Sequence, residues 1–157
     1  MAVTVRCYRE SDRERLKDIT EQAFPGSSID KLIEHKYGVL NGTSWAVRKR
    51  KAIDDDCDAN PEGIFIAEDE GRIVGYITTR LWRETRMGWI PNLAVDPTCQ
   101  GQGCGRKLLN RALEYFREAG MTHAKLETLE VNEVGQHLYP SVGFEELVRQ
   151  IHYTMEL

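Results

Sequence analysis

The sequence predicts an α/β (α+β) protein in which a mixed, mostly antiparallel sheet is flanked by helices. Short segments with apolar residues at every second position are interspersed with segments of helical spacing. A turn at Asp69-Glu70-Gly71 joins two of the strand-like segments into a hairpin, whose strands pair antiparallel. One unit has the order strand, loop, helix, strand, and its crossover predicts a parallel pair. At 157 residues, a single domain over 1–157 is expected.

Composition excludes several classes of protein. Lys and Arg total 21 against 25 for Asp and Glu, a net charge of -4, so no nucleic-acid partner is expected. The absence of a long apolar run or a signal-peptide pattern predicts a cytoplasmic protein with no membrane partner. The four cysteines lack Cys-x-x-Cys spacing, which predicts free thiols and no metal site.

The N-terminal segments predict one strand and two helices. Val3 to Tyr8 alternates apolar and polar residues, as a strand does. Ser11 to Glu14 has the pattern of a capping box, which predicts that the first helix begins there and ends at Pro25-Gly26. A second helix is expected from Ser28 to Leu40, with Asn41-Gly42 as its stop.

The segment 43–63 has the weakest pattern in the chain. Arg48 to Lys51 is basic and Asp54 to Asp58 is acidic, which we interpret as a solvated insertion with self-neutralising charges, the alternative being a docking patch. Ile64 to Glu68 and Arg72 to Trp82 follow as two strands of a hairpin.

The C-terminal segments predict the strand, loop, helix, strand unit and further elements after it. A strand over Trp89 to Val95 leads through a glycine-rich loop to a helix whose apolar residues are Leu108, Leu109, Ala112, Leu113 and Phe116. The remaining expected elements are a strand over 123–129, a short helix over 133–141, and a closing strand pair over 144–148 and 151–155.

The loop Gln100 to Gly105 lies between a strand end and a helix start, where backbone N–H groups and the helix dipole favour a phosphate group. The dinucleotide pattern would need glycine at Arg106, and a Walker loop would need Gly-Lys-Ser/Thr at Gly105-Arg106-Lys107. Neither pattern fits. From the glycines alone, a merely flexible loop is an equal alternative.

The run from Asn92 to Leu109 resembles the acetyl-CoA signature of the GCN5-related N-acetyltransferase (GNAT) family. The family pattern Gln/Arg-x-x-Gly-x-Gly/Ala is met at Gln100, Gly103 and Gly105. A second family motif follows in the expected order, with Asn132, Gly135, Leu138-Tyr139 and Gly143-Phe144. The resemblance covers most of the chain and is weakest over 43–63.

This resemblance implies that acetyl-CoA is the acyl donor and that one strand end splays from its parallel neighbour. Backbone groups of the splayed strand would pair with pantetheine and polarise the acetyl carbonyl. The short helix places Asn132, Gly135, Gln136 and Tyr139 on one face, from which the Tyr139 hydroxyl would protonate the departing thiolate. The expected cofactor-binding residues are Leu93, Ala94, Val95, Gln100, Gly101, Gln102, Gly103, Cys104, Gly105, Arg106, Asn132, Gly135 and Tyr139.

The general base has no clear candidate on the expected strand. Some family members use a glutamate in the stretch that here holds Gly88, Trp89 and Ile90, and no carboxylate is present there. Glu127 and Glu130 are the candidates, acting through water, with solvent-exposed charge as the alternative for each.

The resemblance therefore predicts an acetyl-CoA-dependent N-acetyltransferase that transfers the acetyl group directly to a primary amine in a ternary complex. The acceptor would be a protein N-terminus, a lysine side chain or a small amine. The alternative is a non-catalytic acyl-CoA-binding or regulatory module, and a homodimer is left open.

Overall fold

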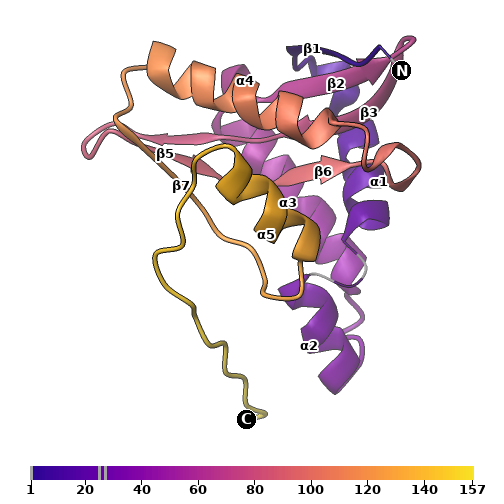
Figure 1. Ribbon diagram of the computed structural model, residues 1–157. Helices are drawn as coiled ribbons and strands as arrows, with labels where there is room; N and C mark the ends of the chain where they lie inside the picture. The colour runs from indigo at the N-terminus through magenta and orange to yellow at the C-terminus, as the bar shows by residue number, and fades with distance from the viewer. Residues whose placement is uncertain (1, 25, 27) are drawn as a thin grey trace.

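The computed structural model describes residues 2–24, 26 and 28–157 (Figure 1). Pro25, half of the expected stop of the first helix, lies outside the described residues. The α-helices are α1 Arg13–Ala23, α2 Ile29–Tyr37, α3 Trp45–Ala59, α4 Cys104–Glu118 and α5 Glu133–Ser141. The strands are β1 Thr4–Cys7, β2 Phe65–Asp69, β3 Arg72–Ile77, β4 Arg80–Trp82, β5 Met87–Ile90, β6 Leu93–Val95 and β7 His123–Leu126.

The strands form two sheets that meet where the chain passes from one to the other. The first is antiparallel, in the order β1-β2-β3-β6, and the second has the order β4-β5-β7. In the second sheet β4 pairs antiparallel with β5, whereas β5 and β7 are parallel from Met87 opposite His123 to Ile90 opposite Leu126. The mixed, mostly antiparallel architecture with one parallel pair is therefore confirmed.

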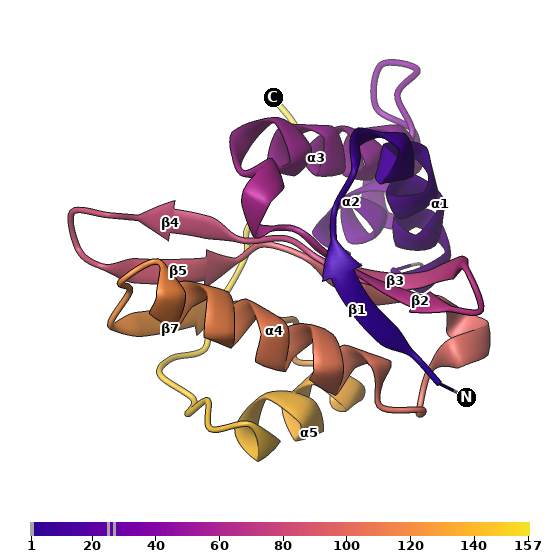
Figure 2. The same ribbon diagram turned by 90° about the horizontal axis from the view of Figure 1, so that it is seen from above.

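The helices form two layers on opposite faces of the sheets, as Figure 2 shows, with α1, α2 and α3 on one face and α4 and α5 on the other. Leu16, Ile53 and Tyr76 belong to the apolar cluster beneath α1 and α3. Leu108 and Phe116 belong to the cluster beneath α4. The helices α1, α3 and α4 thus bury their apolar sides against the sheets, as helical spacing requires.

The connection between β5 and β6 reverses the direction in which side chains alternate. Ile90, before the connection, packs in the α4 cluster, whereas Ala94, an even number of residues later, packs in the cluster beneath α1 and α3. A strict two-residue alternation would place both on one face, so Pro91-Asn92 acts as a bulge. Here β6 leaves the parallel pair and joins β3 in the other sheet.

The expected continuous strands over 72–82 and 89–95 are therefore each divided in two. The first breaks at the buried residues Thr78 and Thr79, and the second at Pro91-Asn92. Thr79 donates a side-chain hydrogen bond to the Gly63 carbonyl at 2.7 Å, so the break is stabilised from outside the strand ladder. The alternation of apolar and polar residues predicted that these segments are strands, but it did not predict that the chain changes from one sheet to the other within them.

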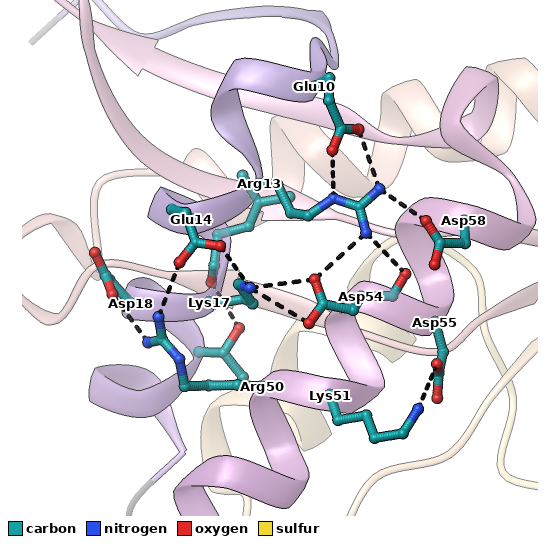
Figure 3. A network of polar contacts seen from close by, with 12 residues as sticks. Glu10, Arg13, Glu14, Lys17, Asp18, Arg50, Lys51, Asp54, Asp55 and Asp58 are labelled. Carbon is teal, nitrogen blue, oxygen red and sulfur yellow. Dashed lines mark hydrogen bonds and ion pairs between the residues drawn. The ribbon is translucent and has the colours of Figure 1, made fainter.

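The prediction of a solvated insertion over 43–63 is wrong, because this segment contains α3 and packs against α1. Arg13 forms ion pairs with Glu10, Asp54 and Asp58, of which the last two lie on α3 (Figure 3). Arg50 of α3 forms ion pairs back to α1, including one with Asp18 at 2.9 Å. The basic and acidic runs are thus largely neutralised by another helix, although Lys51 does pair with Asp55 on α3 itself.

Two predicted helix boundaries also change. The first helix is preceded by a 3₁₀ turn, Glu10–Asp12, and the Asp12 carboxylate caps this turn by accepting the Arg9 N–H at 2.8 Å, in place of the predicted pair Ser11 and Glu14. The second helix stops at Tyr37, because Gly38 takes a φ of +79° that ends helical geometry.

The predicted closing strand pair over 144–148 and 151–155 is absent from the structure, in which residues 144–157 have no strand partner. The tail runs away from the sheets to the C-terminus (Figure 1) and contacts α2 through a 2.7 Å hydrogen bond between Tyr37 and Thr154. Alternating apolar residues supply only the pattern of a strand, whereas a strand also needs a paired edge. In the described part of the chain, no helix combines the length and the apolar character needed to cross a membrane.

Candidate active site

The free edge of β6 presents backbone groups at the place where the two sheets part. The Asn92 carbonyl accepts from Thr78 N–H at 2.9 Å, and Asp96 N–H donates to the Val74 carbonyl at 2.8 Å, so both residues face β3. By antiparallel alternation, Ala94 also faces β3, and the N–H and C=O groups of Leu93 and Val95 point to the other side. Of the three predicted backbone contacts, Leu93 therefore lies open and Ala94 is engaged in the sheet, while Val95 keeps an open N–H and its carbonyl accepts from the Gln100 side chain.

The glycine-rich loop connects this edge to the start of α4. Gly101 and Gly103 have φ values of +77° and +83°, a backbone region that side chains disfavour, and a Cβ on either would meet only open space. The first backbone N–H groups of α4, at Cys104, Gly105 and Arg106, have no helical carbonyl to bind. The loop therefore offers several N–H donors toward solvent at a helix N-terminus, which suits a phosphate.

The other predicted loop residues have different surroundings. Gln100 donates a side-chain hydrogen bond to the Val95 carbonyl at 3.3 Å, which ties the loop to β6, and Gln102 is exposed. Cys104 is buried in the core beneath α4, and burial raises the pKa of its thiol, so it is not a reactive nucleophile. Gly105 allows close helix packing, since a Cβ there would lie 3.3 Å from Leu138 of α5.

The predicted face of α5 is present, with Tyr139 at its centre. The Tyr139 ring packs edge-on to Phe144, with ring centroids 6.2 Å apart, and against Gly135, where an added Cβ would lie 2.9 Å from the ring. Asn132 caps the helix by accepting the Gly135 N–H at 3.1 Å. Burial raises the pKa of the Tyr139 hydroxyl, and in the described part of the chain that hydroxyl has no hydrogen-bond partner.

The two candidate bases are both exposed and both engaged. Glu127 accepts a 2.8 Å hydrogen bond from the Trp89 indole and pairs with Lys125. Glu130 pairs with Arg149 of the tail. Ile90 and Leu126 are the last paired residues of β5 and β7, and β6 departs just beyond them. Glu127 directly follows Leu126 and is therefore closer to this point than Glu130 is.

A polar cluster that the sequence did not reveal lies on the α3 side of this point. Asp56, almost fully buried, accepts hydrogen bonds from Thr78, Asn92 and Arg80, each at 2.8 Å. Lys49 of α3 donates to the Asn92 side chain at 3.2 Å. In the sequence Lys49 and Asp56 belong to charged runs, and only the packing of α3 separates them from their exposed neighbours.

An open cavity of about 360 Å³ adjoins this cluster. Its lining includes Asn60, Arg80, Trp82 and Trp89. The two indole rings lie 5.8 Å apart, and the Lys125 ammonium is 5.1 Å from the ring of Trp82 and 5.6 Å from that of Trp89. The α3 side thus offers aromatic and charged groups to a small ligand.

The features of this site indicate a class of protein. A splayed strand edge, an N–H-rich loop and a helix whose tyrosine hydroxyl is unpaired among the described residues together suit a transferase that uses a phosphate-bearing thioester. Residues 16–144 match the Acetyltransferase (GNAT) family, and the chain belongs to that family. The resemblance predicted from the two motifs is confirmed.

Curated relatives include two kinds of acetyltransferase. Mycothiol acetyltransferase of Segniliparus rotundus is 30% identical over an alignment of 164 positions, which covers 97% of this chain and 55% of that protein. The [ribosomal protein bS18]-alanine N-acetyltransferase of Haemophilus ducreyi is 40% identical over 65 residues, 41% of this chain and 45% of the other. The chain thus spans about half the length of the first relative, and its alignment with the second covers about half of that protein.

Solved structures confirm the fold. PaiA N-acetyltransferase from Thermoplasma acidophilum, in complex with coenzyme A, aligns with a TM-score of 0.74 and 17% identity over 92% of this chain and 91% of that one. AAC(6')-Iy, in complex with a bisubstrate analogue, aligns over the whole of both chains with a TM-score of 0.68 and 16% identity. At these identities the likeness concerns the fold alone.

Proposed function

We propose that this protein transfers an acetyl group from acetyl-CoA directly to a primary amine. The observation that carries the proposal is the free edge of β6, where the open Leu93 groups and the open Val95 N–H lie between the glycine-rich loop and the break at Pro91-Asn92. Family membership and the relatives' names, which include an alanine N-acetyltransferase, support this activity.

The residues present fit acetyl-CoA on the α4 and α5 side of the sheets. The N–H groups of the loop would hold the pyrophosphate, and the Leu93 carbonyl and the Val95 N–H would pair with the pantetheine amides. Gly101 and Gly103 leave the space above the loop free of side chains. Bound acetyl-CoA supplies an activated thioester whose sulfur is the leaving group.

Three groups of the chain would carry the chemistry. The Leu93 N–H would donate to the carbonyl oxygen as negative charge develops on it, a contribution of about 3–4 kcal/mol where such donors have been removed. The Tyr139 hydroxyl, with no competing partner in the described residues, would donate its proton to the sulfur. Glu127, acting through a bridging water, would accept the proton that the amine must lose.

The test is to measure acetyl-CoA binding and CoA release against a panel of peptides, lysine derivatives and small amines. Acetylated product from at least one amine is expected, with product identity established by mass spectrometry. Glu127→Gln should lower turnover. Glu130→Gln is the matched control, since Glu130 pairs with Arg149 of the tail, and it should lower turnover less. Tight acetyl-CoA binding without product from any amine would instead support a non-catalytic binding module.

A further inference from the structure

The break between β5 and β6 gives the site two sides. The loop Gln100 to Gly105 and Tyr139 lie with α4 and α5, so the donor occupies that face (Figure 2). An amine that attacks directly must then approach from the face covered by α1, α2 and α3. Asn92 directly precedes the open backbone of Leu93, and its side chain points to this second face.

On that face the carboxylate of Asp56 is occupied by hydrogen bonds from the protein and cannot bind the ammonium of an amine substrate. Thr78 and Asn92 both donate to its Oδ2 at 2.8 Å, and Arg80 donates twice to its Oδ1, from Nη2 at 2.8 Å and from Nε at 3.3 Å. The Asn92 amide is thereby oriented, because its Nδ2 must face Asp56. Its Oδ1 consequently faces Lys49 and accepts from the ammonium at 3.2 Å.

Among the described residues, Lys49 is the cation of this cluster that forms no ion pair. The nearby carboxylates are taken, since Asp56 pairs with Arg80 at 2.8 Å and Asp30 with Arg48 at 3.2 Å. In the described part of the chain the ammonium has the single Asn92 hydrogen bond and a contact with the face of the Phe24 ring, whose centroid is 4.8 Å away. An ammonium has three donors, so two remain for a ligand.

Burial gives this arrangement an energetic cost. Desolvation lowers the pKa of Lys49, while the charges of Asp30 and Asp56 oppose that shift. A partly buried cation without a paired anion is unfavourable unless something else neutralises it. A carboxylate on the acceptor would do so and would use the two remaining N–H donors.

We propose that Lys49 determines acceptor specificity by binding a carboxylate carried on the same molecule as the reactive amine, which makes an amino carboxylate the acceptor class. This inference rests on the proposed acetyl transfer. Lys49 would also disfavour polycationic acceptors, since a second ammonium would approach a like charge. Its role is recognition, and it takes no part in the bond-making step.

The test compares acids with their amides. Free α-, β- and γ-amino acids and the corresponding primary amides are assayed as acceptors with wild type, Lys49→Met, Lys49→Arg and Lys49→Glu. The measured quantity is the kcat/KM ratio of acid to amide, divided by the same ratio for Lys49→Met, so that differences in intrinsic amine reactivity cancel. For at least one chain length we expect a value of about 10 to 100, typical of one charge-assisted hydrogen bond.

Other variants separate recognition from structure. Lys49→Arg should retain part of the preference, and Lys49→Glu should shift it toward diamines. Lys51→Met is the matched control, because Lys51 lies two residues along α3 and is 74% exposed, and its acid-to-amide ratio should equal that of wild type. Acetyl-CoA affinity should be the same in all four variants.

A second measurement does not depend on turnover. Calorimetric titration of amino acids and amides into the enzyme bound to CoA should show tighter binding of the acid to wild type but not to Lys49→Met. Equal acid-to-amide ratios in wild type and Lys49→Met, by both rate and binding, would overturn the proposal. Carboxylate-dependent binding without acetylated product would retain the role of Lys49 and reject the proposed transfer.

Discussion

Removal of the Tyr139 hydroxyl should slow the reaction without weakening the fold. The change Tyr139→Phe keeps the ring that packs on Phe144 and Gly135. Because the hydroxyl has no partner in the described residues, no internal hydrogen bond is lost, and the free energy of unfolding should change by less than about 0.5 kcal/mol. A general acid contributes roughly 10²- to 10⁴-fold.

The lower end of that range is expected here. A CoA thiol resembles cysteine, with a pKa near ~8.5, so its thiolate leaves readily even without a proton donor. A loss of roughly 100-fold in kcat corresponds to about 2.7 kcal/mol of transition-state stabilisation. Since burial raises the pKa of Tyr139, the acid form should persist in wild type to a pH above ~10, the ordinary tyrosine value.

The assay is single-turnover release of CoA thiol at saturating acetyl-CoA, with thermal unfolding and acetyl-CoA affinity measured in parallel. Tyr153→Phe, which alters an 87% exposed tyrosine of the tail, is the control and should match wild type. If chemistry limits the rate and Tyr139→Phe has the wild-type kcat, the hydroxyl is not the proton donor and the reasoning fails.

The other predictions concern the loop, the strand end and metals. Gly103→Val should weaken acetyl-CoA binding roughly tenfold or more. The control Gly71→Val, at a similar φ of +79° in the distant β2–β3 turn, should lower the free energy of unfolding by a comparable amount, about 1–2 kcal/mol, and leave the affinity unchanged. Equal losses of affinity in the two variants would show that the loop is not part of the site. Asp96→Asn should lower stability by about 1–3 kcal/mol at pH 7, because hydrogen bonds from Thr98, with further support from Arg15, hold the pKa of Asp96 below its ordinary value despite burial. A carboxylate whose pKa in the folded state is below the unfolded value of ~3.9 stabilises the protein above that pH, and this stabilisation is lost as the pH falls through the folded pKa. The melting curves of Asp96→Asn and wild type should therefore converge below about pH 4. A difference in melting temperature that stays constant with pH would refute the assignment. A chelator should leave turnover unchanged, since the described residues contain no group of three His, Cys, Asp or Glu side chains able to hold a metal; activity lost to a chelator and restored by one metal would contradict this.

Local patterns in the sequence predicted most of the elements, because their signals need no distant partner. The apolar spacing of Leu108 and Phe116 was sufficient to predict α4, and the glycines at 101 and 103 do occupy the positive-φ positions that the loop requires. The tail shows the opposite case. Ile151 and Tyr153 alternate as strand residues do, yet they are exposed, because pairing depends on another edge and not on the pattern itself.

The polar cluster on the α3 side could not be predicted for a related reason. Lys49 and Asp56 stand within runs of like charge, where solvated side chains are the usual outcome. Their neighbours Arg50 and Asp54 do form exposed or partly exposed ion pairs with α1. Only the rotation of α3 about its axis decides which charges face the sheet, and that rotation is set by burial of Ile53 and Cys57 in the cluster beneath α1 and α3.

The bulge at Pro91-Asn92 has a consequence for inhibition kinetics. Because it opens the sheet between two faces, the donor and the acceptor would have separate entrances that meet only at the Leu93 backbone. A compound lodged among Trp82, Trp89 and Arg80 would then compete with the amine while leaving the acetyl-CoA entrance clear. Its inhibition should be competitive against the acceptor but not against acetyl-CoA. A single molecule that blocks both entrances would have to pass through the gap that the bulge at Pro91-Asn92 creates.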